Sequence, residues 1–318
     1  MLKFNIVSEF FKSPSENTDS LNKVANHWDS VQVERKELQN KWYDWGDHPK
    51  VAELVYNELF GSKDISIFDY IRKEHPGFSK FNALSLCCGP GTFEKMLVEN
   101  GVFAEVTGID IAPGLIVDAN ASKSDLEDKL SFIEGDVNAG NFGHNTYDIV
   151  IAKAALHHIE NLEQLMEGVK RCLKPGGHLV TIDFFGPTRF QWTETQLAEA
   201  IKFTRENVPP ELRLKSDGKE YKVTRPTIEQ VIEVDPSEAI RSGEIERFIH
   251  DYFKEIQTFK LGGTLLNLIL DTSIINNFDE SNDVHNQVIE DAFRLERKLI
   301  DVGILGSDFK FIIAEIDK

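Results

Sequence analysis

The chain has 318 residues, of which 41% are hydrophobic and 28% are charged, and its formal net charge is −18. This length accommodates a complete α/β domain with substantial additions. The negative charge argues against DNA or RNA as a partner, because phosphate binding depends on clustered lysine and arginine.

Membrane-spanning and disulfide-stabilised classes are also disfavoured. No apolar run approaches the roughly 18 residues of a membrane span, and the first residues lack a signal-peptide profile. The three cysteines, two of them adjacent at Cys87 and Cys88, give no disulfide framework. We expect a cytoplasmic protein without membrane contact, and the sequence leaves monomer and homodimer open.

Residues 1–80 are expected to form a helical cap. A polar stretch at 13–19 predicts local disorder. Aromatic side chains concentrate at 42–49, including Trp45 and His48. This segment predicts either a packing plug or an aromatic wall over a bound acceptor. The predicted helices of the cap cover residues 21–41, 49–60 and 65–73.

Residues 81–186 alternate strands with helices. A short apolar strand enters the turn Gly89-Pro90-Gly91, and after one helix a second strand ends at Asp110. This alternation predicts an α/β fold with a doubly wound, mostly parallel sheet. Further strands are expected at 130–136, 147–152 and 178–184, with helices at 93–100 and 161–173 and a turn at 174–177.

The glycine turn and Asp110 predict a cofactor that carries a nucleoside. Asp110 follows Gly91 by 110 − 91 = 19 residues, at the tip of a strand, where a carboxylate can bind a ribose diol. The dinucleotide fingerprint has a third glycine where this chain has Glu94, whose carboxylate would repel a pyrophosphate. S-adenosylmethionine is cationic and free of phosphate, so the sequence favours it over NAD.

Residues 187–252 are expected to form a helical insertion over the substrate. The insertion starts at the carboxyl end of a strand, where open α/β sheets bind ligands, so we expect Arg189 and Trp192 to contact the acceptor. Arg189 could instead cap a helix. Predicted helices cover 194–205 and 242–253, and shorter ones begin at 226 and 235.

Residues 253–318 are expected to complete the sheet. The pattern predicts strands at 255–261 and 309–316, and helices at 264–275 and 284–302. The paired Gly262 and Gly263 either admit a substrate close to the backbone or make the strand-to-helix turn.

Between residues 82 and 186 the chain resembles the class I, Rossmann-like S-adenosylmethionine-dependent methyltransferases. The motifs described above carry the resemblance, which implies a seven-stranded sheet whose last strand is antiparallel. Segments 235–239, 262–266 and 307–309 look like methyltransferases of bacterial polysaccharide or secondary-metabolite pathways. The resemblance implies cofactor contacts from Cys87, Cys88, Gly89, Gly91, Asp110, Ile111, Asp136, Val137 and Lys153.

Two positions depart from the family pattern. The acidic residue expected inside the first strand is Ser85 here, and the first glycine of the loop is Cys87. Backbone contacts remain available at both positions, but one side-chain contact is lost or rerouted.

His157 and His158 are the candidate catalytic residues. They follow the fourth strand, and histidine suits proton removal near neutral pH because its ordinary pKa is about 6.5. Either could instead cap the next helix, and Asp183 and His48 are reserve candidates. We expect no metal, because adjacent histidines point in different directions and no fixed ligand spacing is present.

Three functions compete. The leading hypothesis is in-line methyl transfer to oxygen or nitrogen of a small-molecule acceptor, such as a sugar, a polysaccharide precursor or a secondary metabolite, with S-adenosylhomocysteine as product. A protein or peptide methyltransferase is the second, since an acidic surface suits a basic segment. The third is a non-catalytic scaffold that binds S-adenosylmethionine; Ser85 and Cys87 favour it, whereas Asp110, Asp136 and His157 argue against it.

Overall fold

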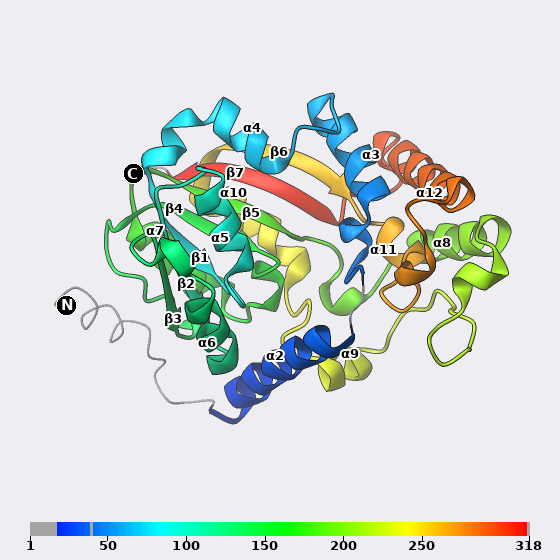
Figure 1. Ribbon diagram of the computed structural model, residues 1–318, viewed down its shortest axis with the longest axis horizontal. Coiled ribbons are helices and arrows are strands. Elements are labelled where there is room, and N and C mark those ends of the chain that lie inside the picture. Colours follow the sequence, from blue (N-terminus) through cyan, green and yellow to red (C-terminus); the bar gives the residue numbers. More distant parts are fainter. Residues whose placement is uncertain (1–17, 39–40, 317–318) are drawn as a thin grey trace.

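The computed structural model describes residues 18–38 and 41–316. Within them, seven strands form one sheet in the order β3-β2-β1-β4-β5-β7-β6 (Figure 1). Strands β1 to β5 pair with one another in parallel, whereas β7 is antiparallel to β5 and β6, which confirms the predicted fold class. The strands are β1 (Asn82–Leu86), β2 (Glu105–Asp110), β3 (Leu130–Glu134), β4 (Tyr147–Lys153), β5 (Leu173–Phe184), β6 (Phe253–Gly262) and β7 (Phe309–Ile316).

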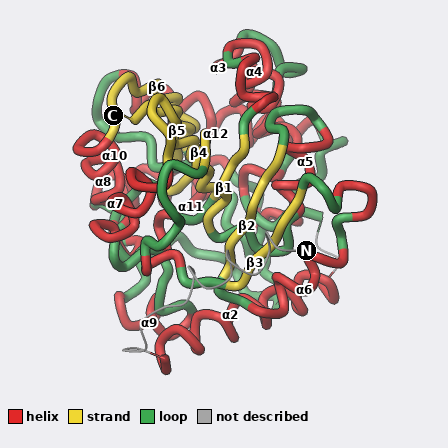
Figure 2. The backbone as a smooth tube through the Cα atoms, turned by 90° about the vertical axis from the view of Figure 1, so that its left-hand side faces the viewer, coloured by secondary structure: helices red, strands yellow, loops and turns green. Residues whose placement is uncertain are grey.

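Helices cover both faces of the sheet. Figure 2 shows α7 and α10 on one side of the strands and α4 and α5 on the other. The strand between them, β4, contains an apolar run, in which Ile149, Val150, Ile151 and Ala152 are all almost fully buried. These helices are α4 (Ile67–Glu74), α5 (Thr92–Glu99), α7 (Leu162–Cys172) and α10 (Ile245–Tyr252).

Of the remaining helices, α6 packs on β2 and β3. Helix α2 contacts α6, and α3 packs with α12 beside the β6 edge (Figure 1). None of the described helices is both long and apolar enough to cross a bilayer. Their bounds are α2 (Thr18–Leu38), α3 (Pro49–Phe60), α6 (Pro113–Ala121), α8 (Glu194–Asn207), α9 (Ile228–Val234), α11 (Leu266–Ile269) and α12 (Asp283–Asp301).

Most predicted elements are present, with shifted ends. Helix α2 begins at Thr18, so part of the predicted disordered stretch is helical, and residues 13–17 lie outside the described part of the chain. The turn at 174–177 lies inside β5 instead of before it. Leu173 pairs with Tyr147 but His178 pairs with Ile149, so the four intervening residues bulge out of the ladder.

Two predicted helices are wrong. Residues 235–239 form a turn, in which Ala239 has a φ of 47°. The helix expected over 264–275 shrinks to α11, because the Asp271 carboxylate accepts a hydrogen bond from the Ser273 amide and starts a turn there. The division of the chain at residues 80, 186 and 252 stays a prediction.

Candidate active site

The turn between β1 and α5 contains two glycines with different roles. Gly91 (φ 74°) is the N-cap of α5, and a Cβ there would lie 2.5 Å from the Phe132 ring. Gly89 (φ 54°) has no protein atom within 4 Å of the place where a Cβ would stand. Packing therefore requires Gly91, whereas Gly89 lets a ligand approach the backbone closely.

Asp110 connects this turn to the end of β2. One carboxylate oxygen accepts a hydrogen bond from the Gly89 amide at 2.8 Å and the other accepts one from the Ala112 amide at 2.9 Å. Burial raises the pKa of Asp110, although these amides oppose the shift. Asp110 thus shapes the turn, and its contact with a ribose stays a prediction.

The other expected cofactor residues share one edge of the sheet, after the carboxyl ends of β1 to β4. Asp136 follows β3 and accepts a hydrogen bond from the Asn138 amide at 2.9 Å. Lys153 ends β4, and its Nζ lies 5.4 Å from the centre of the Phe93 ring. Val137 and Cys88 are buried, whereas Ile111 and Cys87 are half-buried. Burial raises the pKa of both thiols, so they stay protonated near neutral pH.

Cys87 occupies the position of a family glycine at a backbone angle that favours glycine. Its φ is 52°, and a side chain in the left-handed region costs roughly 1–2 kcal/mol. The backbone geometry of the turn is thus retained although the residue type has changed.

Ser85 has an acidic partner that the sequence analysis did not identify. Its hydroxyl donates a hydrogen bond of 2.6 Å to Oε1 of Glu94, in the first turn of α5. Glu94 is only 2% exposed. A carboxyl group therefore lies against the middle of β1 although β1 itself carries none. The loss of the family acid at Ser85 was the one sequence signal for it.

His157 is held by a buried carboxylate. Its Nδ1 donates a hydrogen bond of 2.6 Å to Oδ1 of Asp183, near the end of β5. The other oxygen of Asp183 accepts the amides of Ala155 and Leu156, each at 2.8 Å. Burial is the largest influence on the pKa of His157 and lowers it, but the charge and hydrogen bond of Asp183 prevail and raise it to about 9. Asp183 therefore fixes both the orientation and the charge of the ring.

His158 lies beside it in a different electrostatic setting. The two ring centroids are 4.0 Å apart. The Nδ1 of His158 lies 3.1 Å from Oγ of Ser237, and that hydroxyl donates to Oδ1 of Asp235 at 2.7 Å. Burial, followed by the neighbouring charge of His157, lowers the pKa of His158 well below its ordinary value. The pKa values of the two histidines are thus shifted in opposite directions, upward for His157 and downward for His158.

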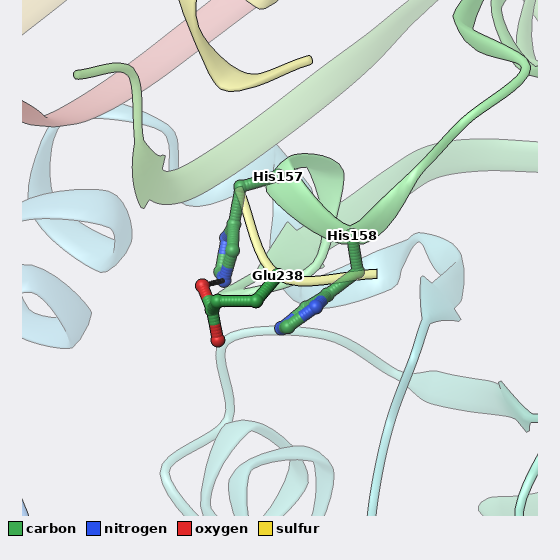
Figure 3. Close-up of side chains that lie close together, drawn as sticks. All are labelled: His157, His158 and Glu238. Atoms are coloured by element: carbon green, nitrogen blue, oxygen red, sulfur yellow. Dashed lines mark ion pairs between the residues drawn. The ribbon is translucent and has the colours of Figure 1, made fainter. Parts of the chain in front are cut away.

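Glu238 completes the group from the insertion (Figure 3). Its Oε1 lies 3.5 Å from Nε2 of His157. The turn that carries it is fixed by a hydrogen bond of 3.0 Å from the Ile240 amide to the His157 carbonyl. One ligand atom from each of His157, His158 and Glu238 lies within 4.8 Å of the others, so the geometry permits a metal as well as a proton-transfer group.

Helix α2 crosses this edge of the sheet. Oδ1 of Asp29 accepts the amide of Leu115 at 3.2 Å, at the start of α6. Trp28 meets the His158 ring edge to face, with 5.1 Å between centroids. The helix therefore touches the elements of both the cofactor side and the histidine pair. The sequence of α2 did not predict these contacts with α6 and with the histidine pair.

Trp45 and Trp192 meet in one aromatic cluster. Trp45 packs on Phe309 with 5.2 Å between centroids, and Trp192 packs on Phe184 with 5.8 Å. Phe184 and Phe309 touch each other, and Phe184 also meets the ring of His157. Both tryptophans are buried, so they contribute chiefly through packing, and their contact with an acceptor stays a prediction.

Arg189 and His48 have structural partners. The guanidinium of Arg189 donates to the Glu238 carbonyl at 2.9 Å, which braces the turn that carries Glu238. His48 is fully buried as the N-cap of α3. Its Nδ1 accepts the Lys50 amide, and its Nε2 lies 3.3 Å from the Phe278 carbonyl. The structure thus places Arg189 beside the catalytic candidates, but it leaves His48 no free ring nitrogen for a substrate.

Comparisons with known proteins identify the central domain. Residues 84–181 match the family model described as a methyltransferase domain. A highly reducing polyketide synthase of Calcarisporium arbuscula is 39% identical over 170 residues, which are 51% of this chain and 6% of that protein. A hybrid PKS-NRPS synthetase of Neonectria sp. is 31% identical over 127 residues, which are 38% of this chain and 3% of that protein. The chain thus spans only a small part of these much longer relatives.

Solved structures show a similar fold over nearly the whole chain. A geranyl diphosphate C-methyltransferase of Streptomyces coelicolor A3(2), in complex with S-adenosyl-L-homocysteine, has a TM-score of 0.53 at 14% identity, covering 96% of this chain and 99% of that one. At this identity the likeness shows the fold alone. The matched family model, together with the strand order and the glycine turn, identifies residues 84–181 as a methyltransferase domain of the class I, S-adenosylmethionine-dependent type.

Proposed function

We propose that this protein transfers the methyl group of S-adenosylmethionine to a small-molecule acceptor of secondary metabolism, and that His157 removes the acceptor's proton. The observation that carries the proposal is the 2.6 Å hydrogen bond between His157 and Asp183, at the same sheet edge as the glycine turn. The polyketide synthases among the relatives support the acceptor class.

The protein has two tasks in this reaction, which are to align the acceptor with the methyl group and to remove the acceptor's proton. Bound S-adenosylmethionine supplies an electrophilic methyl group, so the protein chiefly aligns the acceptor with it. Nε2 of His157 takes the proton, because Nδ1 is committed to Asp183. The imidazolium that results is stabilised by Asp183 on one side and by Glu238 on the other.

A base of this kind favours particular acceptors. An amine that is neutral at working pH needs no base, whereas a hydroxyl or an acidic C–H group does. We therefore favour hydroxyl or carbon acceptors, such as a 1,3-dicarbonyl unit, over amines. A histidine pair enclosed by α2 and the 235–240 turn also suits a small molecule better than a folded protein.

The proposal is tested by incubating the full chain with methyl-labelled S-adenosylmethionine and four acceptor pools. These are β-keto thioesters, phenols and sugars, amines, and basic peptides. We expect labelled product from one of the first two pools. Transfer only to peptides would favour the protein methyltransferase, and binding of the cofactor with no transfer to any pool would favour the scaffold.

A further inference from the structure

Glu94 has one carboxylate oxygen without a partner. Oε1 accepts the Ser85 hydroxyl, but Oε2 has no hydrogen-bond donor among the described residues, although the side chain is 98% buried. Leaving a buried polar atom unpaired is costly, so a native structure that does so calls for an explanation. The simplest one is a donor that arrives with a ligand.

The groups around Glu94 place it on the cofactor side. Ser85 on β1 contacts it, and the groups that interact with it electrostatically are Cys88 in the glycine turn, Asp110 at the end of β2 and Lys153 at the end of β4. Burial is the main cause that raises the pKa of Glu94 to about 7. Hydrogen bonds from the Ser85 hydroxyl and from its own amide lower the pKa, as does the charge of Lys153, whereas Asp110 raises it further. Each of these residues belongs to a segment in which we expect cofactor contacts.

We propose that Glu94 binds the α-ammonium group in the methionine part of S-adenosylmethionine. The cofactor carries two cationic groups, an ammonium and a sulfonium. Of these two, only the ammonium has N–H donors, and an unpaired acceptor oxygen requires a donor. The adenine amine and the ribose hydroxyls are donors too, but we expect them at Asp136 and Asp110. The inference rests on the cofactor in the proposed function and is independent of the acceptor.

The same geometry explains why the first strand can carry Ser85 where the family has an acidic residue. The hydroxyl of Ser85 fixes Oε1 of Glu94, which leaves Oε2 as the atom that can accept from the ammonium. The carboxylate that the family places on the first strand is thus supplied here by helix α5. Ser85 acts as a positioning residue, and Glu94 is the residue that binds.

The test compares ligands with and without the amino-acid part. Calorimetry on the full chain measures the affinities for S-adenosylhomocysteine, S-adenosylmethionine and 5′-methylthioadenosine. We expect Glu94→Gln to weaken the first two ligands about tenfold or more and to leave 5′-methylthioadenosine unchanged. The matched control is Glu99→Gln, on the solvent side of the same helix, where the side chain is 48% exposed; it should change none of the three.

Two results would overturn the proposal: an unchanged affinity for S-adenosylhomocysteine in Glu94→Gln, or an equal loss for 5′-methylthioadenosine. If S-adenosylmethionine and its product lose affinity equally, the sulfonium is excluded as the partner of Glu94. If only S-adenosylmethionine loses affinity, the sulfonium is the partner and the assignment is contradicted. If Glu94→Gln does not fold, Ser85→Ala should show the same ligand discrimination at about threefold. No discrimination in that variant counts against the proposal.

The pH dependence of cofactor affinity gives a second test of the Glu94 assignment. Because the ammonium prefers the ionised carboxylate, affinity for S-adenosylhomocysteine should rise from pH 6 to pH 8 in the wild type and much less in Glu94→Gln. Asp110, Lys153 and Cys88 interact electrostatically with Glu94 and are the same in both proteins, so the difference isolates Glu94. Identical pH dependence would contradict the proposal. None of these measurements needs an acceptor, so a failure of the proposed methyl transfer would be a separate result.

Discussion

The proposed cofactor side and the proposed acceptor side of the site are built in different ways. On the cofactor side, β1, the glycine turn, α5 and β2 follow one another in the chain, and Asp110 ties the turn to the strand. On the acceptor side, His157, Asp183 and Glu238 come from three separate segments, and α2 adds a fourth. A contiguous motif leaves its spacing in the sequence, whereas a site assembled by tertiary contacts does not.

The largest expected effect is on the acceptor side. His157→Gln should lower turnover about 10²–10⁴-fold, because the proton acceptor is lost, and should leave the affinity for S-adenosylhomocysteine unchanged. Initial rates and calorimetry measure the two quantities. His144→Gln, at an exposed histidine, is the control. A loss of affinity that matches the loss of rate would place His157 in the cofactor pocket and erase the division between the two sides.

Asp110→Ala should produce the converse pattern. It removes the hydrogen bonds to the Gly89 and Ala112 amides as well as the expected ribose contact. We expect affinity for S-adenosylhomocysteine to fall by about 1.5–3 kcal/mol, or roughly 10- to 100-fold. The comparison is with Asp128→Ala, at an exposed carboxylate. Unchanged affinity would show that the ribose assignment is wrong.

The pH dependence of turnover sharpens the acceptor side further. His157 has a pKa raised to about 9, so it is mainly protonated at pH 7 and gains its free-base form as the pH increases. Turnover should therefore rise between pH 7 and pH 9. Asp183→Asn removes the charge that raises this pKa, so its rise should occur at lower pH and at a lower overall rate. A profile of unchanged position in Asp183→Asn would contradict the coupling of the two residues.

The smallest effect should come from metal removal. We propose that the cluster of His157, His158 and Glu238 works with protons, as expected from the sequence, so dialysis against EDTA should leave turnover unchanged. Recovery by added Zn²⁺ or Mg²⁺ after a loss would show that the cluster holds a metal instead. Wild-type protein dialysed without chelator is the control.

The sequence predicted most of the fold because its elements follow local rules. The uninterrupted apolar run of β4 and the glycine turn both depend on neighbours in the chain. It failed at 235–239, where an acid followed by proline and serine is typical of a helix start. In the structure, Ala239 has a φ of 47° and the Ile240 amide bonds to the His157 carbonyl, so tertiary contacts determine a turn.

For the candidate site, the sequence indicated where some residues would lie, and their roles in binding and catalysis stay predictions. His157 and Asp110 follow strands, which places them at the ligand-binding edge of any such sheet. The contributions of Glu238 and Trp28 could not be predicted, because their partners are distant in sequence. His48 was predicted to bind substrate because it lies in an aromatic-rich segment, which can form a ligand wall or a packing plug. In the structure both ring nitrogens of His48 have protein partners, since the ring caps α3 and contacts the Phe278 carbonyl.

A crystal structure of the full chain with S-adenosylhomocysteine tests the central claim most directly. The account predicts that the nucleoside lies over Gly89 with its ribose at Asp110, and that the sulfur faces the side of the site on which Nε2 of His157 lies. A ligand bound elsewhere, or one whose sulfur is separated from His157 by the packed aromatic rings, would contradict it.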